Sequence, residues 1–232
     1  QLDRQEDLRP DVEAAVRTTL GETYRSLGEY QQSLSQLRQA YKLHQDLQGR
    51  AEDNFQRPDL RQIARTTNAL AATLLALAEC DQAKALLERS LQVAREIEDP
   101  ELLEKTQKLR AALFNATDEG QRAEALLRTI WKKRQQDLGD AHLRTHQAAA
   151  DLGFAFMAQH RYAEAIQLLE PAYRAFSDVD PLDTICLRAG VRLARLFMLE
   201  GRIAQALSLY QRSANDLARL LGEEHPHTLT AK

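Results

Sequence analysis

Three arginines form the group of side chains with the clearest chemical potential in this sequence. Arg188, Arg192 and Arg195 are spaced by four and three residues, which places them on one face of a helix. No acidic residue stands four positions from any of them, so the group repels itself unless an anion compensates. Because guanidinium groups bind carboxylates through two parallel hydrogen bonds, we expect Arg192 and Arg195 to pair with the carboxylates of a ligand.

Two histidines are the next candidates for chemistry. His142 and His146 lie four residues apart and could share a metal ion on a helix, but no third ligand stands at a useful spacing. His142 also belongs to the segment 138–145, LGDAHLRT, which parallels LGEEHPHT at 221–228 and favours a capping or surface histidine. Glycine-rich phosphate and dinucleotide loops, an HExxH motif and paired CxxC motifs are missing. The sequence therefore predicts a non-catalytic chain without a metal or cofactor.

The composition is that of a globular, helix-rich protein. Of its 232 residues, 44% are hydrophobic and 28% are charged, and the helix formers Ala, Leu, Gln, Arg and Glu are abundant. The net charge of −3 provides no overall basic field, so a nucleic-acid partner is not expected. No apolar run reaches the roughly 18 residues of a membrane helix, and the chain begins with Gln1 rather than Met. We expect a piece of a longer protein, attached to a membrane only through a segment outside it.

An internal repeat organises the sequence. Residues 20–41, LGETYRSLGEYQQSLSQLRQAY, match residues 152–173, LGFAFMAQHRYAEAIQLLEPAY, at Leu-Gly, at a following aromatic residue and at a turn tyrosine. Residues 193–214 fit the same template, 70–91 fit it more loosely, and a further copy lies around 111–131. The period is about 41 residues, longer than the roughly 34 residues of a minimal repeat of two helices.

Each copy predicts two helices, because its apolar residues recur at the helical spacing and Pro or Gly stands near the ends. The fold class is therefore all-α: a right-handed superhelical solenoid of about five helix-turn-helix pairs plus the start of a sixth. We expect one repeat domain over 1–232, with pairs at 10–48, 57–97, 100–137, 141–178 and 181–221 and a partial helix at 225–232.

The same pattern predicts the connections. The polar segment 49–56 is expected to be an extended loop, and Gly28, Gly120 and Gly201 are expected in the turns within pairs. Cys80 and Cys186 lie three repeats apart, which is tens of ångströms at about 8–10 Å per packed helix. Since a disulfide needs Cα atoms within about 7 Å, two free thiols are expected.

Two segments resemble known families. LGEEHPHTLTA at 221–231 resembles the start of a repeat in the longer tetratricopeptide class named for kinesin light chains. The repeats together resemble this class over nearly the whole chain. The stretch 9–47, which begins RPDVEAAVRTTLGETYRSLGEY, is similar to the repeat array after the transmembrane helix of bacterial receptor-type serine/threonine kinases. The second resemblance implies a periplasmic sensor domain whose parent protein carries the kinase elsewhere; otherwise a cytoplasmic location is expected.

In this architecture the first helix of each pair lines the concave face of the solenoid, and its outward positions meet the ligand. The candidate binding groove comprises Arg65, Asn68, Lys105, Lys108, Gln147, Phe154, Met157, Arg188, Arg192, Arg195 and Met198. Its basic residues outnumber the acidic residues Glu22 and Asp151 on the same faces, and its Phe and Met side chains add adaptable apolar contacts. The sequence thus predicts a protein-interaction or sensor module that binds an acidic or C-terminal protein segment, and the second resemblance implies a link to kinase signalling.

Three alternatives stay open from the sequence. The solenoid could close around a small anionic ligand instead of a protein segment. The arginines could bond groups on neighbouring helices and leave no free surface for a ligand. The chain could also pair with a second copy as a homodimer.

Overall fold

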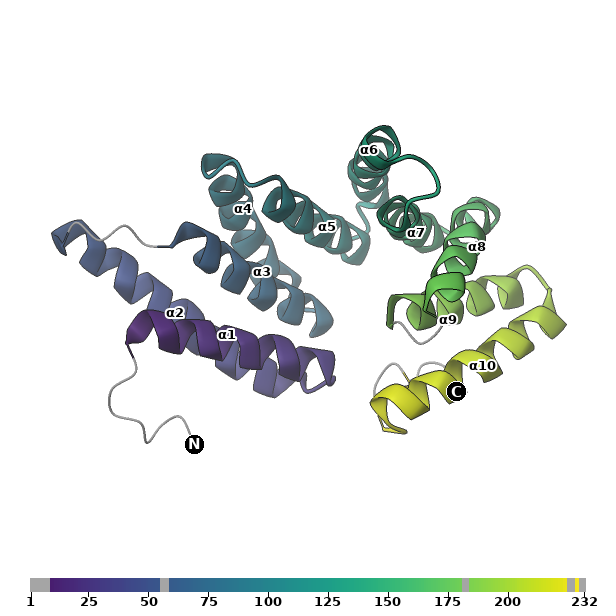
Figure 1. Ribbon diagram of the computed structural model, residues 1–232, viewed down its shortest axis with the longest axis horizontal. Coiled ribbons are helices and arrows are strands. Elements are labelled where there is room, and N and C mark those ends of the chain that lie inside the picture. The colour runs from purple at the N-terminus through teal and green to yellow at the C-terminus, as the bar shows by residue number, and fades with distance from the viewer. Residues whose placement is uncertain (1–8, 55–58, 181–183, 225–227, 230–232) are drawn as a thin grey trace. The chain divides into compact units, whose positions relative to one another are not determined.

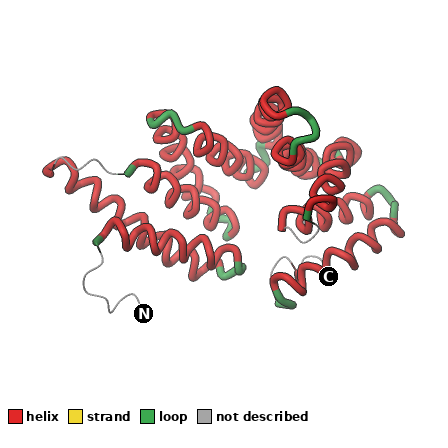
Figure 2. Tube along the Cα trace, viewed as in Figure 1, coloured by secondary structure: helices red, strands yellow, loops and turns green. Residues whose placement is uncertain are grey.

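The computed structural model describes residues 9–54, 59–180, 184–224 and 228–229 of the chain. Within these ranges the chain forms helices joined by short turns, and it has no strand (Figure 2). The prediction of an all-α helical repeat fold is confirmed. The chain divides into two compact units, unit 1 at Gln1–Ala116 and unit 2 at Thr117–Lys232. The two helices of the pair predicted at 100–137 fall in different units, and the organisation as one repeat domain stays a prediction.

Unit 1 contains the first five helices (Figure 1), which are α1 Pro10–Ser26, α2 Tyr30–Asn54, α3 Leu60–Ala76, α4 Cys80–Glu96 and α5 Pro100–Ala116. Each of them packs against the next, while α1 also contacts α3 and α3 also contacts α5. The odd-numbered helices are therefore the first helices of successive pairs, and they form a row in which neighbours touch.

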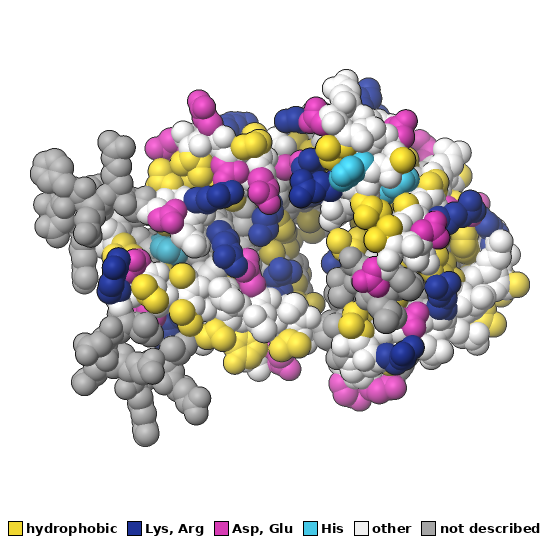
Figure 3. Space-filling model, viewed as in Figure 1, with side chains coloured by type: hydrophobic (Ala, Val, Ile, Leu, Met, Phe, Trp, Pro, Cys, Tyr) yellow, Lys and Arg dark blue, Asp and Glu magenta, His cyan; other side chains and the backbone are white. Residues whose placement is uncertain are grey.

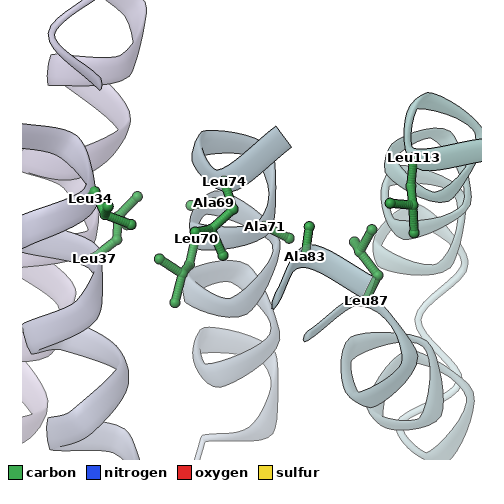
Figure 4. Close-up of a cluster of buried hydrophobic side chains, with 9 residues drawn as sticks. All are labelled: Leu34, Leu37, Ala69, Leu70, Ala71, Leu74, Ala83, Leu87 and Leu113. Atoms are coloured by element: carbon green, nitrogen blue, oxygen red, sulfur yellow. The ribbon is translucent and has the colours of Figure 1, made fainter. Parts of the chain in front are cut away.

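Leucines at the helical spacing build the core of unit 1. Leu34 and Leu37 of α2 face Leu70 and Leu74 of α3 (Figure 4), and none of the four is more than 6% exposed. Burying such a side chain stabilises the fold by about 1.5–3 kcal/mol. Gly21 allows α1 to pack closely against α2, because a Cβ atom at that position would overlap the side chain of Leu37. The two helices of the first pair therefore approach more closely than a larger residue would permit.

Buried polar groups link the first helices of unit 1. Thr66 Oγ1 of α3 lies 2.7 Å from Thr18 Oγ1 of α1, and Asn68 Nδ2 of α3 donates a hydrogen bond to Thr106 Oγ1 of α5 at 2.9 Å. Each of these four side chains is at most 1% exposed. A buried polar group without a partner costs about 1–3 kcal/mol, so these matched pairs favour one alignment of α1, α3 and α5 over shifted ones.

Unit 2 contains the other five described helices, which are α6 Gly120–Leu138, α7 Leu143–Ala158, α8 Tyr162–Val179, α9 Thr184–Leu199 and α10 Ile203–Leu221. Each packs against the next along the chain. The close approach within a pair recurs here, since a Cβ atom at Gly153 of α7 would lie 2.9 Å from Leu169 Cγ of α8. The same device thus serves both units.

The turn before α7 explains the parallel between 138–145 and 221–228. Thr145 Oγ1 donates to the Gly139 carbonyl oxygen at 2.8 Å, and Thr228 Oγ1 donates to the Gly222 carbonyl oxygen at 2.8 Å. Both glycines have a positive φ, 83° and 95°. His142 Nδ1 accepts a hydrogen bond from the backbone N–H of Arg144 at 3.1 Å, which confirms the expected capping role. His225 and His227 lie outside the described residues.

The turns within pairs differ in part from expectation. Gly28 and Gly201 have φ values of 80° and 75°, in the left-handed region that glycine favours. The prediction for Gly120 is wrong, because this residue begins α6 and the left-handed position before it belongs to Asp118, at φ 60°. Ala78 and His160 occupy equivalent turn positions with φ values of 60° and 61°. A glycine is therefore not required at every turn.

The expected loop at 49–56 is also wrong over most of its length. Helix α2 continues to Asn54, so 49–54 extend the helix, and 55–56 lie outside the described residues. Ala51 and Glu52 are good helix formers, and a helix already started by Leu34 and Leu37 needs no new nucleation to continue. A polar sequence alone is therefore not enough to predict a loop at this position.

Three further observations bear on chemistry. In the described ranges no helix is long and apolar enough to cross a membrane. Nor do the described side chains bring three His, Cys, Asp or Glu residues together as a candidate metal site. Cys80 and Cys186 are free thiols, as predicted.

Candidate functional site

The candidate residues of unit 1 lie on α3 and α5, and most of their charge is compensated within the unit. Arg65 donates to Glu22 of α1 at 2.5 Å, and Lys105 Nζ lies 4.0 Å from the same carboxylate. The hydrogen bond with Glu22 raises the pKa of Arg65. Lys108 pairs with Glu104 at 3.4 Å, one turn away on α5. The alternative that basic side chains bond neighbouring helices therefore applies to unit 1.

Asn68 does not belong to a ligand-facing surface. Its side chain is fully buried, and its amide group is held by Thr106. The helical register explains the difference, because Asn68 points toward α5 within the row of first helices instead of away from it. The prediction of Asn68 as a groove residue is therefore wrong.

A cleft of about 370 Å³ lies between the N-terminal halves of α3 and α5, lined among others by Arg65 and Lys105. Its lining also includes Asp59, Arg61 and Glu101, and Arg61 Nε lies 2.8 Å from Asp99. On the face shown in Figure 3, basic and acidic side chains of this unit are likewise interspersed. The cleft thus offers charges of both signs, and two of its three basic side chains, Arg61 and Arg65, already pair with carboxylates.

The candidate residues of unit 2 come from α7 and α9. The guanidinium carbon of Arg192 lies 3.9 Å from the ring centroid of Phe154, so the cation stacks on the aromatic face. Arg188 and Arg195 are exposed on either side of Arg192 along α9, and Met198, at the end of the helix, is 44% exposed. Gln147 and Met157 of α7 are partly buried. We call Phe154 with the three arginines the arginine surface.

Electrostatics sets the arginine surface apart. The pKa of Arg192 is lowered to about 10, first by burial and then by the positive charge of Arg188, while Asp151 acts in the opposite direction. Within the part of the chain that the structure describes, no carboxylate lies within 4.0 Å of the guanidinium groups of Arg188, Arg192 or Arg195. Among the described residues, these three arginines therefore have no acidic partner on α9 or on the neighbouring helices.

Three other arginines in the described part of unit 2 lie over phenylalanine rings, and each has a carboxylate partner. Arg128 lies 5.8 Å from the ring of Phe156 and pairs with Glu124. Arg161 stacks on Phe156 at 4.2 Å and pairs with Glu124 and Glu164 at 2.5 and 2.6 Å. Its hydrogen bond with Glu164 contributes most to a raised pKa.

Arg202 stacks on Phe197 at 3.9 Å and lies 4.0 Å from Glu170. Arg192 has the same aromatic platform without the carboxylate. A buried cation normally has a counter-ion. A ligand could supply the counter-ion that Arg192 lacks.

The sequence identifies the members of this surface but not two contacts between first helices, one within the surface and one in unit 1. The stack of Arg192 on Phe154 joins residues 38 positions apart, and the pair of Glu22 with Arg65 joins residues 43 apart. Both separations are close to the repeat period of about 41 residues. Pairs of outward residues one period apart on first helices were therefore the signal that could have found them.

Comparison with known proteins places the repeats. The sequence profile of the Tetratricopeptide repeat family matches residues 14–53, 63–101 and 188–227. The chain is similar in structure to a Podosopora anserina protein described as having kinesin light chain nearly identical TPR-like repeats, with 20% identity, a TM-score of 0.59 and coverage of 92% of this chain and 99% of that one.

Two further solved structures are similar over most of the chain. NprR, solved in complex with its cognate peptide NprX, gives a TM-score of 0.76 at 11% identity, covering 96% of this chain and 60% of that one. A Rap protein complexed with Competence and Sporulation Factor gives 0.75 at 14% identity, covering 91% and 56%. At these identities the likeness shows the fold alone. A comparison with curated protein sequences finds no match.

Proposed function

Since the chain belongs to the tetratricopeptide repeat family, a fold for protein–protein interaction, we propose that its arginine surface binds an acidic or C-terminal segment of a partner protein. The observation that carries the proposal is the stack of Arg192 on Phe154 without the carboxylate that the stacks of Arg161 and Arg202 have. A carboxylate from a ligand completes the same arrangement.

Peptide binding suits the chemistry of this surface. Phe154 and Met198 offer apolar contact beside the cations, and a side chain as flexible as methionine adapts to different partners. NprR, which shares the fold, was solved with a peptide, and this likeness supports a peptide as the ligand class. Exposed ion pairs contribute only about 0.2–1 kcal/mol each, so apolar and backbone contacts must supply most of the roughly 8 kcal/mol of the micromolar affinity that we expect.

The proposed role is non-catalytic recognition inside a larger signalling protein. The resemblance of 9–47 to the repeat arrays of receptor-type serine/threonine kinases supports a kinase-linked setting. In such a setting the domain senses a partner, and the affinity above allows rapid release.

Charge reversal tests the proposal. Arg192→Glu with Arg195→Glu should abolish binding of acidic peptides, measured by fluorescence anisotropy, because a cationic surface becomes anionic. Arg188→Glu with Arg195→Glu changes only exposed residues and should weaken binding at least about tenfold, since each lost pair removes up to about 1 kcal/mol and repulsion adds to it. Circular dichroism should show unchanged helicity.

The matched control is Arg212→Glu with Arg219→Glu, which makes the same charge change on exposed positions of α10. The control should retain most of the affinity. Equal weakening by the control and by the Arg188 and Arg195 pair would show a general charge effect and sink the proposal. A large thermal shift with one small anion and none with peptides would instead identify a small-molecule sensor.

A further inference from the structure

Resting on the proposed function, we propose that the acidic group bound at Arg192 is a phosphoryl group on a side chain of the partner segment. Arg188, Arg192 and Arg195 stand on consecutive turns of α9, on the helix face that would meet this group. Arg188 precedes Arg192 by about 6 Å along the helix axis and Arg195 follows by about 4.5 Å. Long arginine side chains from these positions can reach one shared anion.

The charge balance favours a doubly charged group over a single carboxylate. Asp151 is the acidic residue that acts on Arg192, and its effect is smaller than the opposing effects of burial and of Arg188. A carboxylate carries one negative charge and would leave an excess of positive charge on α9. A phosphoryl group carries about −1.5 to −2 charges at neutral pH and has three acceptor oxygens, so it can satisfy two or three guanidinium groups together.

The orientation of Arg192 fits the same ligand. Phe154 covers one face of its guanidinium plane at 3.9 Å, which leaves the N–H edge as the route for hydrogen bonds. Phosphate oxygens accept two parallel bonds from such an edge. Arg188 and Arg195 are exposed and can close on the remaining oxygens.

The empty site should also carry an electrostatic cost. Arg192 is partly buried beside a second cation and lacks a carboxylate within ion-pair distance among the described residues. Replacing Arg192 by an uncharged side chain should therefore stabilise the unliganded protein while it removes binding. A merely structural arginine, such as Arg202 beside Glu170, should behave in the opposite way.

Three peptide libraries test the inference on the full chain. Each consists of nine-residue peptides with degenerate acidic and apolar flanks and a fixed central phosphoserine, aspartate or serine, and binding is followed by fluorescence anisotropy. The phosphoserine library should bind at least about tenfold more tightly than the aspartate library.

Each outcome of the comparison decides something. Equal binding of the phosphoserine and aspartate libraries would overturn the phosphoryl group and leave the proposed function standing. Binding of none of the libraries would overturn both. If inorganic phosphate displaces the phosphoserine peptides at equal concentration, the ligand is the free anion, and the peptide-borne group is overturned.

Three variants test the inference further, two of them through the melting temperature as well. Arg192→Met should remove the preference for phosphoserine and leave the melting temperature of the empty protein equal or higher, whereas Arg202→Met should lower it. Arg188→Gln, at an exposed position that is safe for folding, should reduce the preference several-fold. The inference would be contradicted if Arg192→Met and Arg188→Gln both retained the preference for phosphoserine. Equal losses of melting temperature in Arg192→Met and Arg202→Met would also contradict it.

Discussion

His44 occupies the centre of a buried hydrogen-bond chain in unit 1. Its Nε2 lies 3.1 Å from Thr66 Oγ1, and Thr66 Oγ1 lies 2.7 Å from Thr18 Oγ1, which donates to the Ala14 carbonyl oxygen at 2.8 Å. Because the proton of Thr18 is used on Ala14, Thr66 donates to Thr18 and His44 donates to Thr66. The ring therefore carries a proton on Nε2, and burial disfavours a second proton on Nδ1.

The burial of His44 makes the stability of unit 1 depend on pH. Burial lowers the pKa of His44 below its usual 6.5, while Asp59 acts in the opposite direction. In the unfolded chain the pKa returns to about 6.5, so the unfolded state binds more protons below that pH. The free energy of unfolding should thus be complete above about pH 6.5 and fall as the pH drops further, by up to about 1.4 kcal/mol per pH unit until the folded-state pKa is reached.

Urea unfolding of the full chain at pH 7.5, 6.5 and 5.5 measures this effect. The matched control is His44→Gln, which keeps an N–H donor for Thr66 and does not titrate. Its stability should change less over the same range. The same loss in both proteins would assign the pH dependence to other groups.

At the scale of the helices, the turns store a small strain. Ala78 adopts a φ of 60° between α3 and α4, where Gly28 and Gly201 stand in other pairs. A residue with a Cβ atom pays about 1–2 kcal/mol for this conformation, whereas glycine adds an entropy cost of about 0.4–1 kcal/mol from the unfolded state. Ala78→Gly should therefore raise the free energy of unfolding by about 0.5–1 kcal/mol.

Chemical denaturation of two variants checks the turn. Ala112, an exposed residue inside α5, is the control, and Ala112→Gly should lower stability by about 1 kcal/mol. A lower stability for Ala78→Gly as well would show that the turn is not strained by its alanine.

These helices could be predicted because their local signals agree with their packing. The spacing of Leu34, Leu37, Leu70 and Leu74 gave both the helical period and the core (Figure 4). Turn positions were less predictable, since Ala78, Asp118 and His160 adopt a conformation that their residue types disfavour and tertiary packing imposes. The C-terminal extension of α2 likewise lacks an apolar signal.

The candidate site could be predicted only in part. The outward face of α9 follows from the spacing of Arg188, Arg192 and Arg195, and the structure describes them as exposed or partly buried. Whether each basic residue is compensated depends on partners about one repeat away, such as Glu22 for Arg65. Spacing along one helix contains no information on those partners, so the pairing of Arg65 within unit 1 could not be predicted from it.

At the scale of the whole molecule, positive and negative charges nearly cancel, but they are unevenly distributed over the surface. The net charge is −3, and many arginines of the described surface have carboxylate partners, as at Arg161. The arginine surface gathers three arginines without such a partner on one helix face, so acidic segments should be directed to α7 and α9 and not attracted to the protein in general. Such local attraction is screened within about 10 Å at 0.1 M salt.

Backbone-amide NMR of the full chain, titrated with an acidic peptide from the aspartate or phosphoserine library, tests this account most directly. We predict shift changes concentrated on α7 and α9, around Phe154 and Arg188–Arg195, that disappear in the Arg188→Glu, Arg195→Glu variant. Shift changes concentrated on α3 and α5 around Arg65 and Lys105, or none at saturating peptide, would contradict it.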